Sequence, residues 1–152
     1  MRKLVLSLAF MILAGVAMSQ TSHDYVEVER AALKTEKKAI VAETMQLTDE
    51  ESKAFWPLYN EYSEKKYVIN TKVYDLILKF ANDYETLSDE AAIELWKENM
   101  KVKNEKARLE STYFKKFQKI LSGKKVLRYF QTESKLAAIV NYQLASEIPL
   151  AE

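Results

Sequence analysis

Apolar residues recur every three or four positions along most of the chain after residue 20. One series begins at Phe55 and continues through Tyr59, Tyr62, Ile69, Val73, Leu76 and Phe80. Another begins at Leu95 and continues through Val102, Leu109, Tyr113, Phe117 and Ile120. Such spacing places one apolar stripe on one face of a helix, as in a coiled-coil seam or a bundle core. The pattern predicts two long helices, over about 48–84 and 88–121.

Two shorter helices are predicted on either side of this pair. The first covers about 25–45, with Val26, Leu33 and Ile40 on one stripe. The last covers about 124–147 and ends before Pro149, because the residue before a proline disfavours helical geometry. Its inward positions are expected to be Val126, Phe130, Ala137, Val140 and Leu144.

Turn-forming residues are scarce after residue 20, where Gly123 is the one glycine and Pro57 and Pro149 are the two prolines. A sheet protein needs more of these residues for its turns. We therefore expect an all-α fold of four helices. A long antiparallel helical hairpin should dominate it, forming an elongated, coiled-coil-like bundle.

The two long helices open with similar sequences, LTDEESKAFW at 47–56 and LSDEAAIELW at 87–96. Thr48 followed by Glu51 has the spacing of a capping box, in which each side chain bonds the backbone N–H of the other. Ser88 stands in the equivalent position, and Ser122 precedes the last helix. The repeat predicts N-terminal helix caps at Thr48, with Glu51, and at Ser88, and the third corner predicts one at Ser122.

The first 19 residues have the layout of a secretory signal peptide. Arg2 and Lys3 precede an apolar run over 4–18, and small residues follow it. The alternative is a single membrane anchor, but that run is shorter than the roughly 20 residues that a span requires. We expect cleavage before Gln20, which leaves 20–152 as one helical domain.

Composition excludes several kinds of chemistry. The chain has no cysteine, and its single histidine, His23, follows directly after the predicted cleavage site. No nucleophile elbow, glycine-rich phosphate loop or calcium loop is present in the sequence. Residues 20–152 hold 21 basic and 22 acidic residues, which is not the basic excess of a nucleic-acid-binding protein. We predict no catalytic residues, no metal site, no cofactor and no nucleic-acid partner.

Aromatic residues are densest in FWPLYNEY, residues 55–62. Tyr59 and Tyr62 lie on the predicted seam and suit either the core or a contact surface. Trp56 lies off that seam, and Trp96 occupies the same place in the second repeat. These four residues are candidates for contacting a partner protein.

A second candidate surface is basic. Residues 115–128 contain six cations and no acid: Lys115, Lys116, Lys119, Lys124, Lys125 and Arg128. The first three suit the C-terminus of a helix, whereas Lys124 and Lys125 open a helix, where positive charge is disfavoured. This basic corner is a candidate site for anionic lipid headgroups or for acidic segments of a partner. Acidic residues gather instead near the other end of the hairpin, over 83–94.

These features together resemble the Spy/CpxP-like periplasmic proteins, a family named for its LTxxQ motif. The matching stretches are LTDEE at 47–51, LSDEA at 87–91 and ILSGKKVLRYF at 120–130, with Glu51 at the motif's usual glutamine position. The resemblance implies a periplasmic helical cradle, often a homodimer, that binds unfolded client proteins without ATP or responds to envelope stress. A second implication is a regulatory module that acts on one membrane signalling protein, such as an anti-sigma factor.

Overall fold

The computed structural model describes residues 33–151, and every regular element within them is helical. The predicted signal peptide, His23 and the start of the first predicted helix lie outside this range. The chain divides into two compact units, Met1–Glu43 and Thr44–Glu152. The described part of the first unit belongs to a helix over 33–45. The predicted all-α fold is confirmed.

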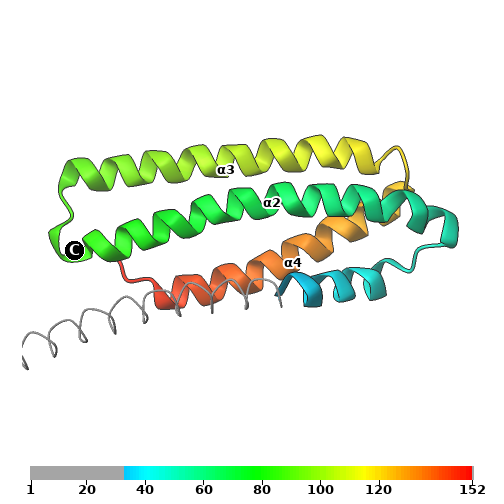
Figure 1. Cartoon of the computed structure of the whole chain (residues 1–152), viewed down its shortest axis with the longest axis horizontal. Coiled ribbons are helices and arrows are strands. Elements are labelled where there is room, and N and C mark those ends of the chain that lie inside the picture. Colours follow the sequence, from blue (N-terminus) through cyan, green and yellow to red (C-terminus); the bar gives the residue numbers. More distant parts are fainter. Residues whose placement is uncertain (1–32, 152) are drawn as a thin grey trace, which may run out of the picture. The chain divides into compact units, whose positions relative to one another are not determined.

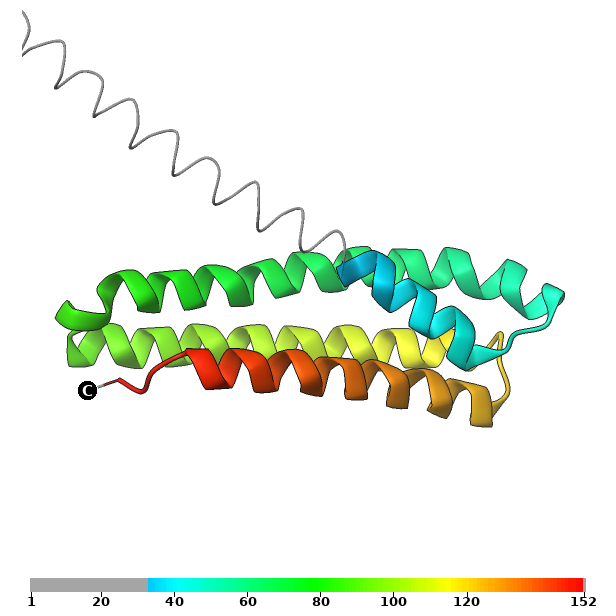
Figure 2. The ribbon, with the colours of Figure 1, turned by 90° about the horizontal axis from the view of Figure 1, so that it is seen from below.

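The second unit contains α2 (Asp49–Asp83), the short 3₁₀ helix η1 (Tyr84–Thr86), α3 (Asp89–Phe117) and α4 (Gly123–Glu147). Helices α2 and α3 pack side by side as the predicted antiparallel hairpin (Figure 1). Their 35 and 29 residues correspond to about 52 and 44 Å at 1.5 Å per residue. Helix α4 starts where α3 ends and returns along the hairpin (Figures 1 and 2).

Local hydrogen bonds explain where the two long helices begin. The backbone N–H of Thr48 donates to Glu51 Oε2 at 2.9 Å, and the N–H of Glu51 donates to Thr48 Oγ1 at 3.3 Å. Ser88 Oγ accepts from the N–H of Ala91 at 3.3 Å. The capping box and the second cap are therefore confirmed. Ser122 occupies the predicted N-cap position of α4, but its side chain makes no capping hydrogen bond.

Aromatic side chains fill the core at the end of the hairpin that carries the α3–α4 corner. Phe117 and Tyr129 lie with ring centroids 4.7 Å apart, and Phe55 meets Tyr129 edge-on at 5.3 Å. Tyr62 and Tyr113 stack at 4.8 Å. After Ile69 on α2 and Glu133 on α4, neither helix has another buried residue. The tight packing therefore occupies one half of the three-helix unit.

Two of the predicted stripes are misplaced around their helix. In the 33–45 helix, Leu33 and Ile40 are exposed, whereas Val41 and Met45 have no accessible surface. In α4 the fully buried aromatic residue is Tyr129, while Phe130 is half-buried and Val140 is exposed. Val140 lies on the inward side of α4 but beyond the end of the tightly packed core, which explains its exposure.

Candidate binding surface

The four aromatic candidates occupy different environments. Tyr59 and Tyr62 are only 2% exposed and belong to the core. Trp56 is half-buried and meets the rings of Phe55 and Tyr59 edge-on, at 5.1 and 5.3 Å. Trp96 is 62% exposed. The two tryptophans of the repeat therefore have different surroundings, and only Trp96 offers most of its surface to a partner.

Trp96 belongs to a second stripe along α3, which the predicted apolar series through Val102 and Tyr113 does not include. The stripe repeats at alternating steps of three and four residues, and we call it the α3 outer stripe: Ile93, Trp96, Met100, Lys103, Ala107, Glu110 and Phe114. All seven residues are exposed, and the four large apolar ones have exposed fractions between 40% and 62%. This spacing normally marks a seam that another helix covers. The seam toward α2 is a different one, centred on Val102, Tyr113 and Phe117.

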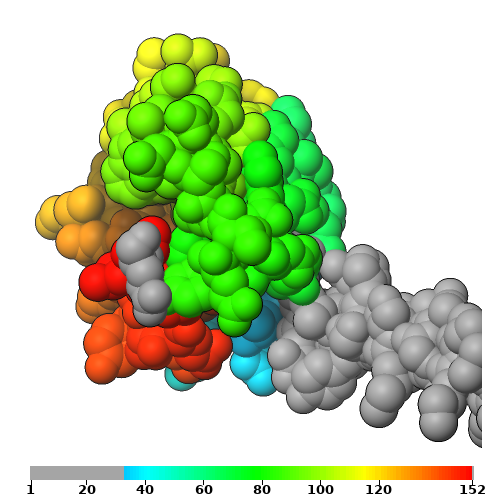
Figure 3. Space-filling model, turned by 90° about the vertical axis from the view of Figure 1, so that its left-hand side faces the viewer, coloured from blue at the N-terminus to red at the C-terminus, as the bar shows by residue number. Residues whose placement is uncertain are grey.

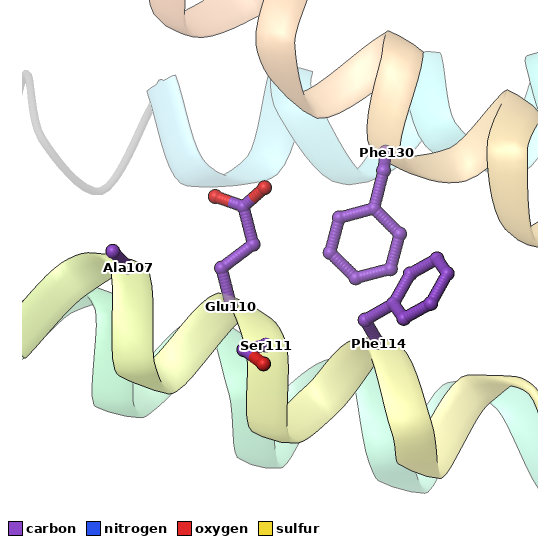
Figure 4. Close-up of a pocket in the computed structure, with 5 residues that line it drawn as sticks. All are labelled: Ala107, Glu110, Ser111, Phe114 and Phe130. Carbon is purple, nitrogen blue, oxygen red and sulfur yellow. The ribbon is translucent and has the colours of Figure 1, made fainter.

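A groove of about 400 Å³ lies at one end of this stripe, lined by Ala107, Glu110, Ser111 and Phe114 of α3 and by Phe130 of α4. The rings of Phe114 and Phe130 face each other with centroids 5.5 Å apart. Figure 4 shows Glu110 beside these rings, with Ala107 and Ser111 on the same length of α3. The groove can therefore accept an apolar side chain and places one carboxylate at its edge.

One lysine of the α3 outer stripe lies over the exposed Trp96 ring. Lys103 Nζ is 5.0 Å from the centroid of the Trp96 ring, within the range of a cation–π contact. An apolar surface with charged neighbours stays hydrated at its margin while it can bury its centre against a partner.

The basic corner separates into paired and unpaired cations. Lys116 Nζ lies 3.3 Å from Glu61 Oε1, and Lys125 pairs with Glu51 while also donating to the carbonyl of Gln46. This pairing explains how a lysine is tolerated in the first turn of α4. Within residues 33–151, no ion pair joins the other four cations of the corner: Lys115, Lys119, Lys124 and Arg128.

A buried ion pair joins α2 to α4. Lys66 Nζ lies 2.5 Å from Glu133 Oε2, and the two side chains are 12% and 5% exposed. Burial and, secondly, the charge of Glu133 raise the pKa of Tyr59 to about 12 and raise the pKa of Tyr129 further above its ordinary value. Burial, followed by the nearby charge of Lys66, lowers the pKa of Lys106. The Lys66–Glu133 pair therefore links α4 to the hairpin in a poorly solvated part of the unit.

Within the part of the chain that the structure describes, no group of three or more His, Cys, Asp or Glu side chains could hold a metal ion. In the same range, no helix has both the length and the apolar character to cross a bilayer. Neither a protein-family model nor a curated protein nor a solved structure matches the chain.

Proposed function

We propose that the chain is a helical binding protein of the bacterial cell envelope that holds unfolded or partly folded proteins on the α3 outer stripe. The observation that carries the proposal is the exposure of Ile93, Trp96, Met100 and Phe114 along one face of a 29-residue helix. Exposed apolar surface of this extent in a soluble protein usually marks a site that a partner covers.

The surface suits varied partners more than one small ligand. The groove beside Phe114 is open to solvent and not an enclosed cavity, and the rest of the stripe is an open helix face. Methionine and aromatic side chains adapt to differently shaped apolar segments. The resemblance to Spy/CpxP-like proteins supports the same activity, the periplasmic location and a homodimer.

Aggregation of a chemically unfolded client, followed by light scattering, tests this activity. We expect suppression at a few-fold molar excess of the protein, with no ATP. The double variant Trp96→Ser/Met100→Ser should lose most of the suppression while it unfolds at the same temperature, because both side chains are exposed. A matched control, Val68→Ser/Leu78→Ser, removes two exposed apolar residues from α2 and should keep the activity. No suppression by the wild-type protein would refute the proposal.

The alternative is a sensor or regulator that acts on one membrane signalling protein. Crosslinking in intact envelopes followed by mass spectrometry separates the two functions. Many crosslinked proteins favour the binding of unfolded clients, whereas a single dominant membrane protein favours regulation.

A further inference from the structure

Helix α4 has an outward face with an unusual composition. At 3.6 residues per turn, its exposed positions Lys124, Leu127, Arg128, Gln131, Lys135, Ile139 and Tyr142 fall within about 120° of the helix circumference. Val126, Tyr129 and Glu133, which are buried, lie on the opposite side. We call the exposed set the α4 outer face. Figure 2 shows α4 running along the margin of the three-helix unit.

All charged residues of the α4 outer face are basic. It carries Lys124, Arg128 and Lys135, and no ion pair joins any of them to another residue within 33–151. The only acids in α4 are Glu133, which is buried against Lys66, and Glu147 in the last turn. Lys115 in the last turn of α3 and Lys119 in the α3–α4 turn add two further cations that form no ion pair within 33–151. This face would therefore attract an anionic partner in preference to a cationic one.

The same face also exposes apolar side chains. Leu127, Ile139 and Tyr142 have exposed fractions between 57% and 77%. They are spread over residues 127–142, a distance of about 22 Å along the helix. A face that carries both cations and exposed apolar side chains can combine electrostatic attraction to anionic lipids with burial of apolar surface, the two contributions that bind helices to a membrane interface.

We propose that the α4 outer face docks the protein on an anionic lipid bilayer, with α4 parallel to the surface. Lys124, Arg128 and Lys135 would contact lipid phosphates, and the three apolar side chains would enter the headgroup region. A helix face is convex, which suits a flat bilayer. An acidic peptide or a nucleic acid would leave the three apolar side chains without a matching environment.

The acidic residues of the hairpin lie away from the start of α4. Asp83, Glu85, Asp89 and Glu90 lie around the α2–α3 corner, the end of the unit that faces the viewer in Figure 3. They are well separated along the hairpin from the cations at the start of α4. Electrostatic attraction would therefore be strongest at the start of α4, and entry of Ile139 and Tyr142 into the headgroup region would keep the rest of the helix parallel to the surface.

Vesicle co-sedimentation tests the proposal, using protein recovered from cells and confirmed by mass spectrometry to have the same N-terminus in every variant. We expect binding to vesicles of phosphatidylcholine with phosphatidylglycerol, weak binding to phosphatidylcholine alone, and loss of binding as salt rises. Each cation near an anionic surface strengthens binding about fivefold. The triple variant Lys124→Gln/Arg128→Gln/Lys135→Gln should therefore bind roughly a hundredfold more weakly.

A matched control removes the same charge from exposed positions of the hairpin, as Lys53→Gln/Lys101→Gln/Arg108→Gln, and should bind nearly as well as the wild-type protein. Leu127→Asn/Ile139→Asn should weaken binding but keep its salt dependence. Equal losses in the triple variant and the control, or equal binding to both kinds of vesicle, would overturn the proposal. Tighter binding to polyglutamate or to single-stranded DNA than to the anionic vesicles would also overturn it.

Discussion

Removing one partner of the buried Lys66–Glu133 pair should destabilise the fold far more than removing both. The two residues are 67 positions apart in sequence, and their side chains are 12% and 5% exposed. Breaking such a pair leaves a charge in a poorly solvated site, which typically costs about 3–5 kcal/mol. Replacing both by apolar residues of similar size is often neutral or stabilising. We therefore expect a loss of about 3–5 kcal/mol for Lys66→Met and for Glu133→Leu, and of about 1 kcal/mol or less for the double variant.

Urea unfolding followed by circular dichroism measures these free energies, with identical slopes required before the values are compared. The matched control is the exposed pair Lys72–Glu105, whose Nζ–Oε2 distance is 2.7 Å and whose side chains are both 46% exposed. Solvent screens this pair, so its removal should cost no more than about 1 kcal/mol. The reasoning is refuted if the buried and exposed single variants lose equal stability, or if the double variant loses the sum of its two single variants.

Three further predictions concern the caps, a tryptophan and the buried tyrosines. Thr48→Ala should lose about 1–2 kcal/mol and Ser88→Ala about 0.5–1 kcal/mol in the same urea assay, because only Thr48 belongs to a reciprocal capping box; a larger loss at Ser88 would contradict this. Trp56→Ala should cost about 1–3 kcal/mol, since the side chain is half-buried, and an unchanged stability would instead indicate a surface role. The folded-state pKa values of Tyr59 and Tyr129 lie above 10, so the stability that they contribute is complete below pH 10 and is lost as pH rises through those values. Tyrosinate absorbance should therefore show these residues ionising together with unfolding, and ionisation of every tyrosine near pH 10 in the folded protein would contradict the burial.

Local physics made the hairpin predictable from the sequence. Thr48, Glu51 and Ser88 act within four residues of their partners, so their spacing alone indicates where helices begin. The seam residues Phe55, Tyr62 and Tyr113 follow a regular period and are buried as predicted. The predicted end of the third helix, at about 121, is less accurate. Helix α3 ends at Phe117, and a turn separates it from α4.

The remaining features depend on partners far away in the sequence. Tyr129 and Phe130 are adjacent aromatic residues of one helix, and only the direction from which α2 and α3 approach decides which is buried. An acidic residue such as Glu133 is usually exposed. In the structure it is buried and paired with Lys66 of α2. The α3 outer stripe also has a clear three–four spacing, but the spacing alone does not show whether another helix covers that stripe or the one through Val102 and Tyr113.

The most direct test of the proposed function is to locate the client on the surface. A photo-crosslinking amino acid is placed at Met100, within the α3 outer stripe, or at Arg108, an exposed position of the same helix outside that stripe. Each variant is then illuminated with a chemically unfolded client and with the same client after folding. We predict strong crosslinking from position 100 to the unfolded client alone, and little from position 108. Equal crosslinking from both positions, or equal crosslinking to folded and unfolded client, would contradict the α3 outer stripe as the client-binding surface.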